Sequence, residues 1–167
     1  VLRDQLGHKV WPIHRLDRPT SGVLLFAVDQ QAEIAVRNQF LNQEIRKTYT
    51  AIVLGTPPEP DWICAEPIQK LENEPFRNAE TAFRLTGKMQ VQNVEFSRLE
   101  VRPTTGRYHQ IRKHLTSGGH PILGDYLYGQ SEIMDHALKI VGEERLMLHA
   151  SALELTHPMT DEILGIQ

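Results

Sequence analysis

The stretch that decides the fold is His14-Arg15-Leu16-Asp17-Arg18-Pro19-Thr20-Ser21-Gly22, which runs directly into the apolar residues 23–28, VLLFAV. An apolar run of this length with valine at both ends predicts one buried β-strand. Before it, proline fixes its own φ and glycine permits backbone angles that other residues avoid, so Pro19 to Gly22 predicts a tight turn. Asp17 lies between two arginines on this turn and is a candidate functional residue, although a solvated cluster of surface charges would give the same pattern.

The composition is typical of one globular domain. The chain has 167 residues, of which 40% are hydrophobic and 23% are charged, and this is enough to bury a sizeable core. We expect a single domain over residues 1–167. The sequence shows no apolar run near the roughly 20 residues that span a bilayer, and no secretory leader. The single cysteine, Cys64, excludes an internal disulfide and a cysteine-rich metal site. We therefore expect a cytoplasmic protein with no membrane partner.

Positive charge is concentrated in one part of a mildly acidic chain. The net charge is −3, yet residues 98–113 carry five cations against one acid, Glu100. This distribution is compatible with binding a phosphate backbone at one place. A solvated charged face is the alternative interpretation. The five cations are Arg98, Arg102, Arg107, Arg112 and Lys113.

The rest of the chain predicts an α+β fold. Asp29 is a suitable N-cap for a helix, and polar residues 61–90 are interpreted as a connection with one short strand. A change of phase in the apolar positions predicts a β-bulge near Ser97-Arg98. The expected helices cover about 30–43, 107–115 and 131–141. The expected strands cover 23–28, 46–55, 81–85, 91–101 and 146–155, the last being apolar on both faces and hence central.

An arginine lies at the edge of a predicted core-facing stripe. Tyr108, Ile111 and Leu115 have the spacing of one helix face, and Arg112 lies beside them. A buried arginine needs a carboxylate partner because an unpaired buried charge is strongly unfavourable. Asp17 has the right charge to be that partner.

Tyr49 is a candidate on one of the predicted strands. It alternates with Ala51 and Val53 and should share their face. From spacing alone, Tyr49 is either a core aromatic residue with a polar tip or a member of the site.

Several families of enzyme are excluded by missing motifs. The chain has no glycine-rich dinucleotide fingerprint, no phosphate-binding P-loop and no G-x-S-x-G elbow. Its eight histidines form no H-E-x-x-H, and His109 and His114 would point about 140° apart on one helix. We expect no metal and no cofactor, and a metal-dependent hydrolase is kept as an alternative to be tested.

Four ordered blocks resemble the RluA-type pseudouridine synthases. The opening stretch is similar to their catalytic motif, and three later blocks match in the same order. These blocks are Lys47-Thr48-Tyr49-Thr50-Ala51, then residues 105–114 (TGRYHQIRKH) continued by residues 120–125 (HPILGD), then residues 145–150 (RLMLHA) with His157-Pro158.

The resemblance implies the family's catalytic fold, a mixed and mainly antiparallel sheet flanked by short helices and loops. It implies an RNA isomerase, free of cofactors, that replaces the C–N glycosidic bond of uridine by a C–C bond. Asp17 would be catalytic, with its ionised form favoured by Arg112, and Tyr49 would lie against the uracil. Attack on the ribose, attack on the base and removal of a ribose proton all stay open as the role of Asp17. Arg15 would enter the stack left by the flipped base.

The remaining expected contacts are also taken from the resemblance. The substrate-binding set comprises Tyr49, Arg112, Arg15 and Ile111. Candidates for contact with RNA phosphates are Arg18, Lys47, Arg107, His109 and Lys113.

Within the family, the amino-acid sequence of these blocks is most similar to that of members that modify tRNA. Ribosomal RNA is the alternative substrate. The family's N-terminal strand motif and usual C-terminal end are missing, so we expect a chain truncated at both ends. A monomer is expected, because the site is built within one chain. A catalytically silent RNA-binding module is the alternative from another functional class.

Overall fold

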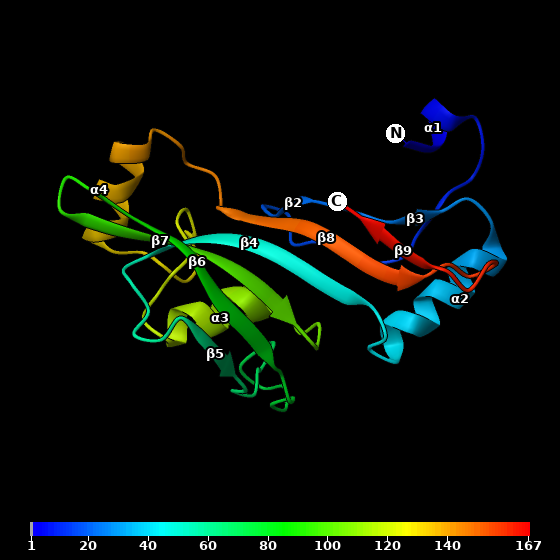
Figure 1. Cartoon of the computed structure of the whole chain (residues 1–167), viewed down its shortest axis with the longest axis horizontal. Helices are drawn as coiled ribbons and strands as arrows, with labels where there is room; N and C mark the ends of the chain where they lie inside the picture. The colour runs from blue at the N-terminus through cyan, green and yellow to red at the C-terminus, as the bar shows by residue number, and fades with distance from the viewer. Residues whose placement is uncertain (1) are drawn as a thin grey trace.

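The computed structural model describes residues 2–167 as a long twisted sheet with helices at its ends and on one face (Figure 1). The helices are α1 (Leu2–Leu6), α2 (Gln30–Leu41), α3 (Gln110–Ser117) and α4 (Glu132–Val141). The strands are β1 (Trp11–Pro12), β2 (Ser21–Gly22), β3 (Phe26–Ala27), β4 (Arg46–Leu54), β5 (Asp61–Cys64), β6 (Thr81–Val91), β7 (Val94–Pro103), β8 (Leu148–Thr156) and β9 (Ile163–Ile166).

Within residues 2–167 the main sheet has seven strands in the order β2-β8-β4-β7-β6-β5, and β9 pairs with β8 on the same edge as β2. The β2–β8 pair is parallel and the other pairs are antiparallel. β1 and β3 form a separate two-stranded ribbon. The predicted α+β class, with a mixed and mainly antiparallel sheet, is therefore confirmed.

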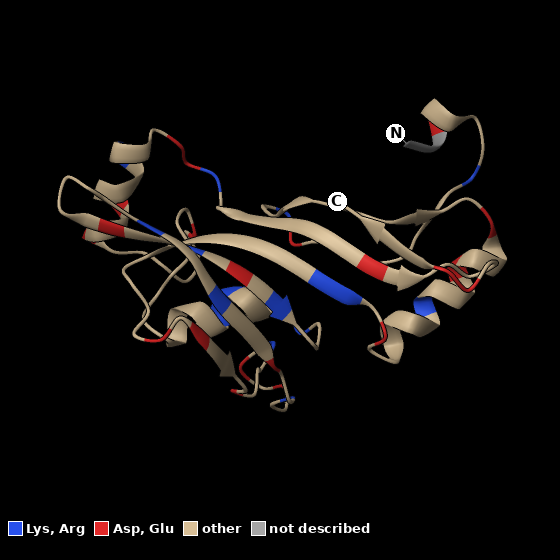
Figure 2. Ribbon diagram, viewed as in Figure 1, with Lys and Arg blue, Asp and Glu red and all other residues tan. Residues whose placement is uncertain are grey.

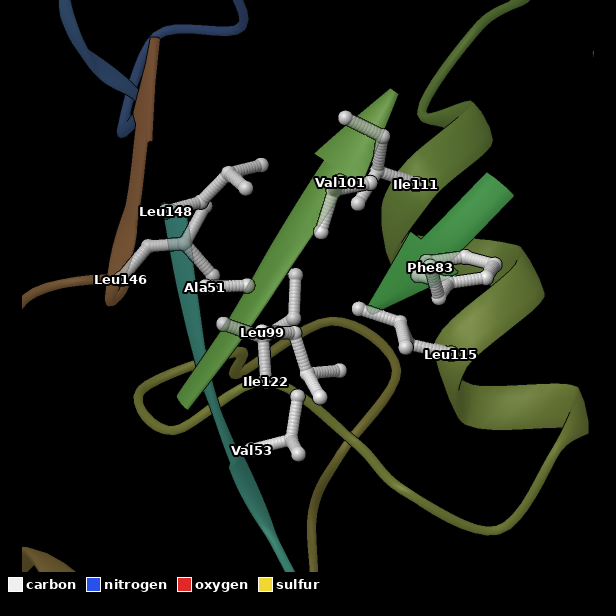
Figure 3. Close-up of a cluster of buried hydrophobic side chains, with 10 residues drawn as sticks. All are labelled: Ala51, Val53, Phe83, Leu99, Val101, Ile111, Leu115, Ile122, Leu146 and Leu148. Atoms are coloured by element: carbon white, nitrogen blue, oxygen red, sulfur yellow. The ribbon is translucent and has the colours of Figure 1, made fainter. Parts of the chain in front are cut away.

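The largest core cluster fixes α3 against the sheet. Ile111 and Leu115 pack on Phe83, Leu99 and Val101 from β6 and β7 (Figure 3). Burying an aliphatic side chain of this size contributes about 1.5–3 kcal/mol. The same cluster therefore holds the polar residues of α3 in a fixed orientation beside the sheet.

The predicted β-bulge near Ser97-Arg98 is right in position but lies on the partner strand, because β6 has the extra residue opposite Arg98 whereas β7 pairs with β4 in one unbroken register. Alternation along this strand puts Phe96 and Leu99 on opposite faces of the sheet. Phe96 packs in a cluster with residues of α4, whereas Leu99 packs in the cluster with α3. The shift in the spacing of apolar residues along β7 therefore arises because α4 packs on one face of the strand near its start and α3 packs on the other face near its end. The irregularity lies in β6, where the pairing skips Thr86.

The predicted single strand over residues 23–28 is also wrong. The run leaves the main sheet after β2 and joins the small ribbon at β3, so one ladder cannot include all of it. Val23 N donates to the carbonyl oxygen of Ala150 in β8 (2.9 Å), whereas Leu25 O accepts from Ile13 N (3.1 Å). Leu24 in between is 43% exposed.

The helix predicted over residues 107–115 begins later, at Gln110. The amide oxygen of Gln110 accepts hydrogen bonds from the Thr105 hydroxyl (2.7 Å) and the Arg107 N–H (2.9 Å). These bonds hold the preceding residues as a turn. Tyr108 therefore lies outside the helix and is exposed rather than in the core.

The other predicted helices and the central strand are confirmed. Asp29 caps α2 through a 2.8 Å bond from Ala32 N, and α4 covers 132–141 with Ser131 as its cap. β8 lies between β4 and the edge strands β2 and β9. Sequence reasoning missed β5, β9 and the extension of β6 to Val91.

Candidate active site

The loop that carries Asp17 is fastened to β8 at its far end. Thr20 N donates to Asp17 O (2.8 Å), which closes the predicted turn. Gly22 has a φ of +115°, and a Cβ there would lie 2.2 Å from the carbonyl oxygen of Ala150. Only glycine fits this close approach of two backbones. The loop is therefore well defined, and its Asp17 side chain is 26% exposed.

An open cleft of about 610 Å³ lies beside Asp17. Its walls come from the Asp17 loop, α2, β4, and residues 103–112. The start of β4, which is cationic, is blue in Figure 2. Among the described residues, the cleft is lined by one carboxylate, that of Asp17, and by five cationic side chains. These cations are Arg15, Arg37, Lys47, Arg107 and Arg112.

The hydrogen-bonded partner of Arg112 is Asp125. Arg112 Nε and Nη2 donate to the two carboxylate oxygens of Asp125 at 2.8 and 2.7 Å. The Arg112 side chain is 6% exposed and that of Asp125 is fully buried. The predicted proximity to Asp17 exists at a longer distance, with 4.0 Å between Arg112 Nη1 and Asp17 Oδ2. Sequence reasoning expected Asp17 to be the main partner, and this expectation is corrected.

The Asp125 side chain binds Arg112 and also accepts hydrogen bonds from the backbone of its own loop. Its Oδ1 accepts from Leu127 N (3.1 Å) and Tyr128 N (3.2 Å). Gly124 before it has a φ of +80°, and a Cβ there would lie 2.1 Å from the carbonyl oxygen of Arg145. Asp125 could have been found from the sequence, because it ends the block HPILGD. Its pairing with Arg112, which lies 13 residues earlier in the chain, could not be read from that block.

Tyr49 packs against the main core and also lines the cleft, so both interpretations of it apply. Burial, together with the nearby charge of Asp17, raises the pKa of Tyr49 to about 12. Its phenol is therefore protonated at neutral pH. Ile111 and Leu148 line the same cleft and add apolar surface beside the ring.

His109 faces Asp17 from the start of α3, in a left-handed conformation with a φ of 53°. Its Nε2 lies 3.9 Å from Asp17 Oδ1, and its Nδ1 lies 2.9 Å from the hydroxyl of Tyr128. Its ring stacks on Tyr108 at 3.7 Å between centroids. Burial lowers the pKa of His109, while the charges of Asp17 and Arg112 act in opposite directions. His109 was predicted as a phosphate contact, and the structure places it next to the catalytic candidate.

The rim of the cleft carries three arginines. Arg15 is exposed, as its expected role in the base stack requires. Arg107 donates from Nε to Asn78 O (2.9 Å) and keeps the rest of its guanidinium available. Arg37, on α2, was missed because the sequence shows only an exposed position on a packing helix. Only the tertiary fold brings α2 to the cleft.

The other cations predicted to contact RNA differ in position. Lys47 lines the cleft and donates to Thr105 O (3.1 Å), and burial lowers its pKa. Arg18 is exposed but does not line the cleft. Lys113 donates to Gln69 O (2.5 Å) and likewise lies outside the cleft lining.

No group of three or more His, Cys, Asp and Glu side chains arranged to hold a metal ion is found in the described part of the chain. His109 and His114 contact different partners, although His109 precedes α3 in a left-handed conformation and the predicted spacing on one helix does not apply. His114 contacts the Thr81 hydroxyl (3.0 Å) and Glu66 O (2.9 Å) instead of approaching the cleft. Within residues 2–167, no helix has the length and hydropathy needed to cross a membrane.

Comparison with known proteins links this geometry to one family. The family model described as RNA pseudouridylate synthase matches residues 2–117. The chain is 38% identical over 183 residues to tRNA pseudouridine synthase C of Vibrio cholerae, with 100% of this chain and 75% of that protein covered. It is 40% identical over 183 residues to the protein of the same name from Salmonella typhimurium, with 100% and 70% covered.

Two solved human structures share the fold. RNA Pseudouridylate Synthase Domain Containing 4 matches with a TM-score of 0.78 and 26% identity, covering 98% of this chain and 73% of that one. RNA Pseudouridylate Synthase Domain Containing 1 matches with a TM-score of 0.83 and 24% identity, covering 99% and 70%. The chain thus belongs to the RluA-type RNA pseudouridylate synthase family and is a pseudouridine synthase, an isomerase of RNA.

Proposed function

We propose that this chain converts a specific uridine of tRNA to pseudouridine, with Asp17 as the catalytic residue. The observation that carries the proposal is that, among the described residues, a single carboxylate and five cationic side chains line the same cleft. The cations attract the phosphate backbone, and Asp17 supplies the one carboxylate that lines the cleft within residues 2–167, which can act as nucleophile or base. The names of the relatives that match across the whole chain support tRNA as the substrate.

Asp17 has to be ionised to act on the ribose or the base. Arg112 Nη1 lies 4.0 Å from its carboxylate and places a positive charge beside it. Because Asp125 holds the other side of the guanidinium, Arg112 stays in place and does not collapse onto Asp17. Asp17 therefore keeps a partly exposed carboxylate directed at the cleft.

Tyr49, Ile111 and Leu148 supply the wall against which a uracil ring would lie. Aromatic and aliphatic surfaces suit the faces of a base. With a pKa of about 12, Tyr49 offers a neutral hydroxyl that can donate a hydrogen bond throughout the neutral range. Release of the N1 glycosidic bond and re-attachment through carbon then take place between this wall and Asp17.

A uridine in folded RNA must leave its stack to enter this cleft, which costs a few kcal/mol. The volume of about 610 Å³ is within the range of sites that enclose small molecules. Arg15 on the rim is placed to fill the vacated stack, and Lys47 and Arg107 to contact phosphates. Because every one of these groups comes from one chain, we propose a monomer, and we place its action on RNA in the cytoplasm.

The test compares wild-type protein with Asp17→Asn and Asp17→Ala on tRNA transcripts and on ribosomal RNA fragments. Tritium release from labelled uridine reports the reaction, and chemical mapping reports the position. Asp135→Asn, at an exposed position on α4 and outside the cleft lining, is the matched control. We expect isomerisation of tRNA by the wild type and the control, none by the Asp17 variants, and RNA binding by all four.

Full activity in Asp17→Ala would refute the catalytic assignment. Activity on ribosomal RNA alone would refute tRNA as the substrate while leaving the isomerase assignment intact. RNA binding by the wild type without isomerisation of either RNA would favour a silent binding module.

A further inference from the structure

Both groups that face Asp17 from α3 are held by one short loop, residues 124–129. Asp125 of this loop binds Arg112, and Tyr128 contacts His109. Tyr128 itself does not line the cleft. Its hydroxyl therefore acts on the site through His109, whereas its ring packs on the Arg112 guanidinium at 5.0 Å.

The contact between Tyr128 and His109 determines which nitrogen of His109 carries the proton. If Nδ1 donated to the Tyr128 oxygen, the lone pair of Nε2 would face the Asp17 carboxylate at 3.9 Å, which is electrostatically unfavourable. If the Tyr128 hydroxyl donates to Nδ1, the neutral ring carries its proton on Nε2 and directs an N–H at Asp17. Partial burial disfavours the doubly protonated ring.

We propose that Tyr128 is a positioning residue of the isomerase: its hydroxyl donates to Nδ1 of His109 and keeps the Nε2–H directed at Asp17. This inference rests on the proposed catalytic role of Asp17. In this arrangement His109 is a neutral donor beside the carboxylate. It stabilises negative charge on Asp17 without the permanent ion pair that an imidazolium would form.

The charges around His109 come from three segments. Asp17 lies on the opening loop, and its carboxylate favours protonation of the ring. On α3, two cations oppose protonation, and on the 124–129 loop one buried carboxylate favours it. The titratable or charged groups that face His109 are Asp17, Tyr108, Arg112, Lys113, Asp125 and Tyr128.

Tyr128→Phe is the decisive variant. It removes the hydroxyl and keeps the ring, whose centroid lies 5.0 Å from the Arg112 guanidinium carbon and 5.9 Å from Lys113 Nζ. Tyr128 is not in the buried core, so the fold is expected to persist. Tyr126→Phe, two residues earlier on the same loop and 49% exposed, is the matched control.

Nitrogen NMR of histidine-labelled protein gives a readout that does not depend on activity. The His109 signal is assigned as the one lost in His109→Gln. We expect the Nε2–H tautomer in the wild type and in Tyr126→Phe. In Tyr128→Phe we expect a mixture of tautomers and a raised pKa for His109, because the donor that required a neutral ring is gone. A wild-type ring protonated on Nδ1 would overturn the proposal.

Single-turnover kinetics on the tRNA substrate test the consequence. We expect Tyr128→Phe to react about tenfold more slowly at neutral pH, the equivalent of one hydrogen bond, with unchanged tRNA affinity. The deficit grows as the pH falls, because a protonated His109 pairs with Asp17. If the wild type is active and Tyr128→Phe matches it in rate and pH profile, only the positioning role fails. If the wild type itself does not isomerise RNA, the proposed function fails, and the positioning role with it.

Discussion

Replacing Asp125 with asparagine tests how far the folded state depends on the buried pair with Arg112. Asparagine keeps the shape of the side chain and, through its Oδ1, the bonds from Leu127 N and Tyr128 N. It removes the negative charge and places an amide N–H₂ opposite Arg112 Nε, which is a donor facing a donor. The buried guanidinium then loses its hydrogen-bonded carboxylate and keeps only the Asp17 carboxylate, 4.0 Å from Nη1.

The structure sets the size of the effect. The two side chains are 6% and 0% exposed, and both bonds are 2.8 Å or shorter. Breaking a buried pair of this kind by removing one partner costs about 3–5 kcal/mol. Because three of the four contacts of Asp125 survive in the variant, we expect about 3 kcal/mol. For a chain of this size that loss corresponds to a decrease in Tm of about 6–12 °C.

Urea denaturation and calorimetry measure the loss, and the exposed pair Arg84–Asp61 provides the comparison. Arg84 Nε lies 2.7 Å from Asp61 Oδ1, the same bond length, but more than half of each side chain is exposed. We expect Asp61→Asn to have a free energy of unfolding close to that of the wild type. If Asp125→Asn loses no more stability than Asp61→Asn, the buried pair does not hold the fold and our reasoning is refuted.

Two further substitutions test other parts of the site. Because folding raises the pKa of Tyr49 from 10.0 to about 12, the unfolded chain loses this proton first and the native state loses stability as the pH rises from 10 to 12. Tyr49→Phe should remove about 2–3 kcal/mol of this alkaline loss in urea titrations, and parallel curves for the two proteins would contradict the burial of the phenol. Gly22→Ala should lose roughly 3 kcal/mol or more by calorimetry, because its Cβ would lie 2.2 Å from Ala150 O at a φ of +115°. Gly165→Ala, with open space around it, should match the wild type, and an equal Tm for both variants would show that the loop can move away.

The sequence predicted those parts of the molecule whose signals are local. Asp29 identified the start of α2 because a cap and its helix are neighbours in the chain. Asp17 and Tyr49 were found because each belongs to a recognisable block. The register of β6 and β7 was not predictable, since Leu99 packs in a cluster with α3 and Phe96 packs in a separate cluster with α4.

The partners of the site were harder to predict than its members. Arg112 was expected to need a carboxylate, yet spacing does not distinguish the partly exposed Asp17 from the buried Asp125. His109 was assigned to phosphate contact from the family resemblance. Its contact with Tyr128 depends on how the loop after α3 folds back, and no periodic pattern encodes that path.

The attachment of the Asp17 loop has a consequence for how the enzyme unfolds. Arg112 and Tyr49 are anchored in the main core, whereas the loop reaches the sheet through β2, a strand of two residues on the edge of β8. Opening free energies differ between segments of one protein, and short edge ladders lie at the low end. The proposed catalytic centre is therefore assembled from a core-anchored half and a half held by a short edge strand. We expect transient release of this edge strand to separate Asp17 from its partners while the core stays folded, so that activity is lost before the molecule unfolds globally.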